Sequence, residues 1–353
     1  MLVSVIIPVY NVKEYLKRAV NSILDQEFSD FEIILCDNST DYECRNLCIQ
    51  LEKSNDKIKL LSLSPKCGPG AARNAGIDIA QGKYIYFMDA DDFAEKNILS
   101  DNVAIAEKYD CDIVKFGYTA LIADNGGNIV SKTDMLPVFE GLYSFEMVQK
   151  HFDEYLDNIS YSVWSRLYKK EAVGDIRFKK CTTAEDAIFN MEILFKGIKN
   201  IYFNRKPYYY YIGRPSSIMG KYNPNRYYNE LELFKLVEKG IEGWKNHSKL
   251  MYKLNEMYIH SFLMLYNDFT LPNCDLKLGE AAKAAEDIYN SEDIQKAIKI
   301  VSLSKISKLS AKVCYILSVH KMFRTAVLFK RVYIHISYFV KKLRMRKWNL
   351  TGN

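Results

Sequence analysis

Short apolar runs separated by stretches of helical periodicity dominate the first 120 residues, and they constrain the fold more than any other feature. The runs occupy residues 3–9, 31–36, 58–63 and 84–88, and each is nearly continuous in apolar side chains. Such runs are typical of strands that are covered on both faces of a parallel sheet. The pattern predicts βαβ units, and hence an α/β fold with a mostly parallel sheet and helices on both faces.

Two of the intervening stretches predict helices. Between the first two runs, apolar residues recur at the spacing of one helix face: Val12, Tyr15, Leu16, Ala19, Val20, Ile23 and Leu24. We expect Asn11 to cap this helix, with Glu14 as its capping-box partner. The stretch 70–80 is also expected to be helical, and residues 67–74 place two glycines at its start, where free backbone amides favour anions.

Polar side chains follow three of the predicted strands. They are Tyr10–Asn11, Asp37–Ser39 and Asp89–Asp92. In open α/β sheets ligands bind at the carboxyl ends of the strands, so we expect these three segments to converge on one site.

The chain has 353 residues, which suggests two domains. Residues 1–225 are expected to form the α/β domain, with its ligand-binding part at 1–120 and a mixed, aromatic part at 121–225. The pattern becomes helical beyond this, most clearly at 227–241 and 250–266, which predicts a smaller helical domain over 226–353. The tyrosines at 208–211 are expected to pack in the core or at a domain interface, two on each face of a strand, with stacking on sugar rings as the alternative.

Composition excludes several classes of protein. Apolar residues make up 48% and charged residues 26% of the chain, as in folded soluble proteins. The apolar start lacks a basic segment and a cleavage site, so we do not expect a signal peptide. Eight cysteines form no CxxC pair, which argues against a zinc site or a disulfide framework and for a reducing cytoplasm. The net charge of +6 is too small to indicate a nucleic-acid partner.

The acidic cluster Asp89–Asp92 has two interpretations. Three carboxylates within four residues repel one another, and a divalent cation that bridges phosphate oxygens would compensate them. The alternative is a solvated turn in which Asp92 caps the next helix.

Five segments, taken in order, resemble the family 2 glycosyltransferases, which have the Rossmann-like GT-A fold. They are Val3–Asn11, Asp37–Asp41, Gly70–Gly76, Gly82–Asp92 and Glu185–Asp186. The resemblance covers about residues 1–220 and is nearest to bacterial enzymes of capsule, exopolysaccharide and lipopolysaccharide synthesis. Those enzymes also have segments similar to Val163–Lys170 and Tyr208–Ser217.

The resemblance implies a nucleotide-sugar site and a divalent metal, Mn²⁺ or Mg²⁺. The implied nucleotide contacts are Pro8, Tyr10, Asn11, Asp37 and Arg73, with Asp89 on ribose or metal and Asp91 on the metal. An ion pair within the protein is the alternative role for Arg73. Family members commonly have two consecutive acids where this chain has Cys36 and Asp37. The resemblance implies UDP as the nucleotide, and this departure falls at the residue expected to contact its base.

The resemblance also implies the catalytic pair Glu185 and Asp186, with Asp186 as the general base that deprotonates the acceptor hydroxyl. Taken alone, two acids at a helix start are more often simple stabilisers. Trp164 and Arg166 are expected on the acceptor side, with a buried Trp and a surface Arg as the alternative.

Charge is divided unevenly along the chain. Residues 294–353 contain 14 Lys and Arg and no acid, whereas residues 1–293 carry 35 basic and 43 acidic residues. Basic residues interleaved with apolar ones suit the surface of an anionic membrane. The alternatives are a packed helical domain with a solvated basic face and association between copies of the chain.

Together with these observations, the resemblance implies an inverting hexosyltransferase of cell-surface polysaccharide synthesis, located in the cytoplasm at the inner face of the membrane. It would move a sugar from a nucleotide diphosphate donor, UDP-linked as the resemblance implies, to a glycan or lipid-linked glycan. Two alternatives remain open at this point: a nucleotidyltransferase with a related sheet, and a non-catalytic scaffold that binds membrane or nucleic acid.

Overall fold

The computed structural model describes residues 1–351 except 125, 158–161, 181–182, 215–220 and 272. The chain divides into two compact units, Met1–Pro215 and Ser216–Asn353. The division lies before residue 225, where the change of sequence pattern placed the domain boundary. Part of the segment Tyr208–Ser217 that carries the family resemblance falls outside the described residues.

The first unit is built on one sheet. Its strands are β1 (Val3–Val9), β2 (Phe31–Asp37), β3 (Ile58–Ser62), β4 (Tyr84–Phe87), β5 (Phe93–Ala94), β6 (Ile113–Ala123), β7 (Ile129–Met135), β8 (Gly141–Ser144), β9 (Arg166–Lys169) and β10 (Asn200–Gly213). Its helices are α1 (Lys13–Leu24), α2 (Tyr42–Ser54), α3 (Pro69–Ile79), α4 (Ile98–Tyr109), α5 (Phe145–Lys150), α6 (Phe152–Asp157), α7 (Lys170–Val173) and α8 (Glu185–Gly197).

The strand order is β3-β2-β1-β4-β9-β6-β10-β5, with β7 beside β6 and β8 beside β10. The expected parallel pairing holds for β3, β2, β1 and β4, and again between β6 and β10. Elsewhere the sheet is mixed, because β9 inserts antiparallel between β4 and β6 and β5, β7 and β8 also pair antiparallel. The mostly parallel sheet is therefore confined to the first part of the unit.

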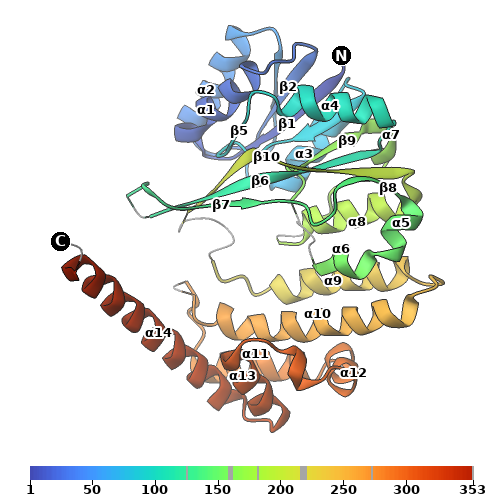
Figure 1. Ribbon diagram of the computed structural model, residues 1–353. Coiled ribbons are helices and arrows are strands. Elements are labelled where there is room, and N and C mark those ends of the chain that lie inside the picture. Colours follow the sequence, from blue (N-terminus) through green and yellow to red (C-terminus); the bar gives the residue numbers. More distant parts are fainter. Residues whose placement is uncertain (125, 158–161, 181–182, 215–220, 272, 352–353) are drawn as a thin grey trace. The chain divides into compact units, whose positions relative to one another are not determined.

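Helices cover both faces of this sheet (Figure 1). Alternate residues of β1 and β2, such as Val5 and Ile33, share one core with α1, α2 and α4. On the other face α3 packs closely, since a Cβ at Gly76 would lie 2.4 Å from Cγ2 of Ile6. Phe189 of α8 contacts Phe87 of β4 at 5.8 Å between ring centroids. Strands buried on both sides explain why the runs are apolar throughout.

One expected helix cap is wrong. The residue that precedes α1 in the capping position is Val12, without a side-chain hydrogen bond, and Asn11 has a left-handed backbone with φ of 52°. Asn11 instead ties two strand ends together, because its side-chain oxygen accepts from the backbone N–H groups of Thr40 and Asp41. Its side chain therefore holds the ends of β1 and β2 together and does not cap the helix.

The second unit is helical. It contains α9 (Arg226–Gly240), α10 (His247–Asp268), α11 (Leu278–Tyr289), α12 (Glu292–Ile300), α13 (Leu309–Val319) and α14 (Phe323–Thr351), with a short 3₁₀ turn at Leu303–Lys305. α10 packs against each of the other five helices. Buried Cys314, Phe323, Ala326 and Val327 show that the basic C-terminal segment contributes to this core. The buried face of that segment therefore fits the alternative of a packed helical domain. Among the described residues no helix is both long and apolar enough to cross a membrane.

Candidate active site

The ends of β1 and β2 meet, as the topology predicts. The register places Val9 opposite Asp37, and the backbone N–H of Asn11 donates to Ser39 Oγ at 3.1 Å. Pro8 is half-buried here, and Tyr10 is 44% exposed. Asp37 is 2% exposed, and its Oδ1 accepts from the backbone N–H of Ser39 at 3.0 Å. The resemblance implies that Asp37 contacts the nucleobase, and in the structure its carboxylate already accepts a hydrogen bond within its own turn.

The three acids after β4 have different partners. Asp89 Oδ1 lies 2.9 Å from Nη2 of Arg73, and Asp91 Oδ2 lies 2.6 Å from Nη1 of Arg214. Asp92 is buried and accepts from the hydroxyl of Tyr209 at 2.8 Å and from the backbone N–H of Ile212 at 2.8 Å. Asp92 is not the helix cap that the solvated-turn interpretation requires, since β5 follows it directly and α4 begins at Ile98. It anchors the acidic turn to β10.

Arg73 joins the acidic turn to the start of α8. Its guanidinium contacts Asp89 through Nη2, and its Nη1 lies 2.9 Å from Asp186 Oδ1 and 3.2 Å from Glu185 Oε1. The Arg73 side chain is 5% exposed. Both terminal nitrogens are thus engaged by carboxylates, which is the ion-pair role that the sequence left open for this residue. If Arg73 also contacts the phosphates, as the family resemblance implies, the phosphates would share these nitrogens with the carboxylates.

Local geometry explains how the acids reach Arg73. Gly70 lies in the first turn of α3, and a Cβ there would lie 2.8 Å from Glu185 Oε2 and 3.1 Å from Cβ of Phe178. The missing side chain therefore lets the start of α8 approach the start of α3. The second oxygen of Asp186 accepts from the backbone N–H of Val163 at 3.2 Å, which fixes the carboxylate from the other side.

Burial and crowding of like charges control the pKa values in this cluster. Burial raises the pKa of Glu185 to about 7, with the charges of Asp186 and Asp89 adding to the rise and Arg73 opposing it. Burial also raises the pKa of Asp186 above its ordinary value, again against Arg73. For Arg73 burial acts to lower the pKa, but the three carboxylates outweigh it and the pKa is raised. A carboxylate with a raised pKa is a stronger base when it is ionised.

The acidic turn fits a divalent cation. Burial, followed by the charge of Asp89, raises the pKa of Asp91, and Arg214 opposes the rise. Mg²⁺ and Mn²⁺ bind through one or two carboxylates together with phosphate and water. Among the described residues no group of three His, Cys, Asp or Glu side chains is placed to hold a metal. Asp89 and Asp91 are the residues that could hold such an ion, together with a phosphate-bearing ligand.

Residues 4–176 match the family model of glycosyl transferase family 2. This segment contains the ends of β1, β2 and β4 and the Arg73 side of the cluster. Residues 4–176 belong to glycosyl transferase family 2. The family prediction is confirmed, and the nucleotidyltransferase alternative is not supported.

Proteins similar in sequence to this domain are named as glycosyltransferases. The putative teichuronic acid biosynthesis glycosyltransferase TuaG of Bacillus subtilis is 29% identical over 196 residues, which cover 56% of this chain and 73% of TuaG. The GalNAc(5)-diNAcBac-PP-undecaprenol beta-1,3-glucosyltransferase of Campylobacter jejuni is 30% identical over 186 residues, which cover 48% and 60%. Glycosyltransferase GlyA of Streptococcus pneumoniae is 26% identical, and the matched region spans 31% of its length.

The fold of the glycosyltransferase is also found among solved structures. Residues 1–349 of S. aureus TarS in complex with UDP-GlcNAc match with a TM-score of 0.64 and 22% identity, over 95% of this chain and 92% of that one. The predicted α/β fold of GT-A type with a helical C-terminal region is confirmed.

Sequence reasoning missed two partners of the acidic turn in the glycosyltransferase. Tyr209 was assigned to core packing, and its hydroxyl also bonds Asp92 and accepts from the backbone N–H of Asp89 at 3.2 Å. Arg214 lies in the segment Tyr208–Ser217 that carries the family resemblance, but no role was predicted for it. The Trp164 ring is buried and stacks on Tyr209 at 4.4 Å, which matches the buried alternative for this residue.

Proposed function

We propose that the chain is an inverting glycosyltransferase that moves a sugar from a UDP-linked donor to a glycan or a lipid-linked glycan in cell-surface polysaccharide synthesis. One observation carries the proposal: Arg73 joins Asp89, on the donor side, to Asp186, on the acceptor side, within a single buried ion-pair cluster. A donor site and a base held together in this way suit a direct displacement between two substrates.

The donor side would be formed at the ends of β1, β2 and β4. Pro8, Tyr10, Asn11 and Asp37 lie at the first two strand ends, where the nucleoside would bind. A divalent metal at Asp89 and Asp91 would neutralise the diphosphate leaving group. UDP as the nucleotide is supported by the TarS complex with UDP-GlcNAc, and the acceptor class by the names of the polysaccharide and undecaprenol-linked relatives.

Asp186 would be the general base. The acceptor oxygen would attack the anomeric carbon as its proton passes to Asp186, a bond from carbon to the acceptor oxygen would form, and the bond to the diphosphate oxygen would break. Each oxygen of Asp186 accepts one hydrogen bond in the structure, from Arg73 or from Val163, and so keeps capacity for a proton. Glu185 would hold Arg73 in place as a positioning residue.

A panel of nucleotide sugars with Mn²⁺ or Mg²⁺ tests this function. Release of nucleotide diphosphate should depend on one donor and should increase when acceptor glycan is added. Analysis of the anomeric configuration of the product should show inversion. Retention of configuration would refute the single displacement, even if transfer occurs.

We also propose that the C-terminal unit docks on an anionic membrane surface. One set of large apolar side chains remains exposed on α13 and α14 and in the turn between them: Leu309, Ile316, Val319, Met322, Leu328, Val332, Tyr333 and Ile336. Exposed Lys308, Lys321 and Arg324 lie among them. Basic and apolar side chains together suit anionic headgroups above acyl chains. This would place the enzyme at the inner face of the cell membrane.

Flotation of the full chain with vesicles tests the docking. Binding should require an anionic lipid, should weaken as salt is raised, and should fall in a Lys308→Glu, Lys321→Glu, Arg324→Glu variant. Lys132→Glu, on exposed β7, is the matched control. Self-association without vesicle binding, seen by sedimentation, would instead favour a second copy of the chain as the partner of this face.

A further inference from the structure

Two buried basic side chains face each other across neighbouring strands of the first unit. Lys115 on β6 pairs in register with Arg166 on β9, and the residues are 7% and 2% exposed. Like charges directly opposite each other in a sheet are destabilising, and burial increases the cost. No carboxylate among the described residues contacts Lys115, whose Nζ bonds Ser165 Oγ at 3.0 Å.

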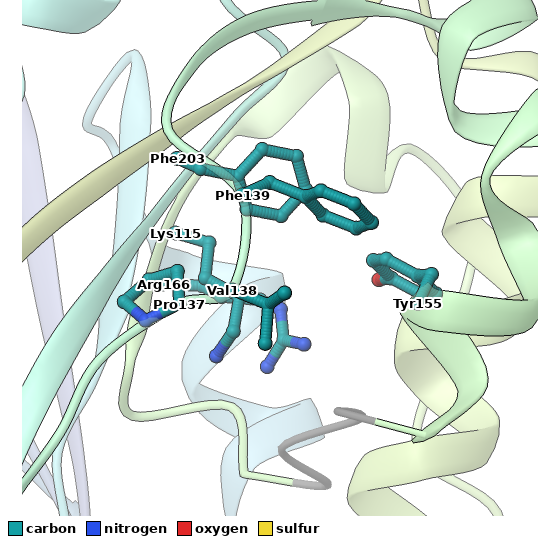
Figure 2. Close-up of a pocket in the computed structure, with 7 residues that line it drawn as sticks. All are labelled: Lys115, Pro137, Val138, Phe139, Tyr155, Arg166 and Phe203. Carbon is teal, nitrogen blue, oxygen red and sulfur yellow. The ribbon is translucent and has the colours of Figure 1, made fainter.

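The pair lines a hollow whose other walls are apolar. Pro137, Val138, Phe139, Tyr155 and Phe203 complete it. Figure 2 shows the nitrogen atoms of Lys115 and Arg166 on the same side of this hollow, with the rings of Phe139 and Phe203 on another side. Convergent donors in a largely apolar concavity are typical of a small-ligand site.

The hollow is connected to the proposed base through a short segment of chain. Val163, whose N–H donates to Asp186, lies three residues before Arg166. The charge of Arg166 is near enough to act on the Asp186 carboxyl, where it lowers the pKa against the larger effect of burial. The Lys115–Arg166 pair therefore lies on the α8 side of the cluster, where the acceptor would bind.

We propose that Lys115 and Arg166 form a subsite for an anionic group of the acceptor, a phosphate or a carboxylate. The assignment to the acceptor rests on the proposed function. An anion would compensate the two facing charges and accept charge-assisted hydrogen bonds from both side chains. Arg offers a fork of donors and Lys a single point charge, a combination suited to a group with several equivalent oxygens.

Burial lowers the pKa of Lys115 well below its ordinary value, and Arg166 adds to this. An anion in the hollow would attract the ammonium form and so raise this pKa.

Calorimetric titration of the full chain with inorganic phosphate, and separately with acetate, tests the subsite without donor or acceptor. Ionic strength is held constant with chloride. Phosphate or acetate should bind saturably, and Lys115→Met should weaken that binding by about ten-fold or more, as expected for loss of a charge-assisted hydrogen bond. Lys132→Met, which changes an exposed lysine on β7, should leave the affinity unchanged. The stronger of the two anions identifies the group.

Equal binding by wild type and Lys115→Met, or no binding of either anion, would overturn the proposal. Methionine of similar length should fold in this apolar setting. If it does not, site-resolved mass spectrometry of reductive methylation in the wild type gives the second measurement: phosphate or acetate should slow modification of Lys115 and leave Lys132 unaffected. Neither assay needs sugar transfer, so failure of the subsite and failure of the proposed function can be told apart.

Discussion

Nη1 of Arg73 lies 2.9 Å from Oδ1 of Asp186, although the two residues are 113 positions apart in the chain. The same guanidinium contacts Asp89 at 2.9 Å. A change at the acidic turn therefore acts directly on the partner of the proposed base. Arg73 therefore holds the two sides of the candidate site together.

Loss of Arg73 should be costly for stability. Arg73→Met leaves three carboxylates without their buried cation, and we expect the free energy of unfolding to fall by about 3–5 kcal/mol. Arg177→Met is the control, since it removes a partly exposed pair with Asp78 and should cost less than about 1 kcal/mol. Urea denaturation measures both. Equal losses in the two variants would show that the cluster contributes no more than a surface pair.

Glu185 should make stability depend on pH. Its pKa is about 7 in the fold against an ordinary 4.5, so the folded state holds the extra proton between these values. The stabilisation by this proton is complete below about pH 4.5 and is lost as pH rises through 7. Relative to Glu185→Gln, the wild type should lose about 3 kcal/mol between pH 4.5 and pH 8. A difference between the two proteins that is constant over this range in urea titrations would contradict the assigned pKa.

Gly70 should be required for the approach of α8 to α3. Gly70→Ala places a Cβ 2.8 Å from Glu185 Oε2, and we expect a loss of about 1–3 kcal/mol together with lower activity. Gly279→Ala on α11 has open space, with Arg324 Nη2 at 3.9 Å the nearest atom, and should be neutral or stabilising by up to about 1 kcal/mol. Thermal unfolding of both variants checks the contrast, which would be absent if the two helices can separate freely.

Tyr209 should hold the acidic turn in place. Tyr209→Phe deprives Asp92 and the backbone N–H of Asp89 of a buried partner, which should cost about 1–3 kcal/mol. Tyr211→Phe, on the same face of β10, should change stability by no more than about 0.5 kcal/mol. Chemical denaturation of the two variants gives the comparison. A loss of donor binding in Tyr209→Phe at unchanged stability would mean that the hydroxyl contacts the nucleotide instead.

The first half of the sheet could be predicted because its strands are covered on both faces and so are apolar almost without interruption. Val3–Val9 is an example. The later strands could not be placed, since β7 is exposed along its whole length and the four-residue β9 carries the buried polar Arg166. A short or exposed strand lacks the apolar pattern from which strands are predicted.

The sequence predicted which residues lie at the candidate site but not which of them contact one another. Asp89, Arg73, Glu185 and Asp186 were each expected at the site, and the structure brings all four together. Their mutual pairing depends on Gly70 and on the 112-residue separation of Arg73 and Glu185, which no local pattern encodes. The link from Asp92 to Tyr209 was missed for the same reason.

The most direct measurement is release of nucleotide diphosphate from a UDP-sugar in the presence of acceptor glycan, compared between the wild type and Asp186→Asn. Loss of a general base should lower kcat by about 100-fold or more. Glu192→Gln, on the same helix and paired with Lys179, should retain wild-type turnover. Wild-type rates in Asp186→Asn would contradict the assignment of the base, and the absence of turnover with every donor in the wild type would contradict the proposed enzyme.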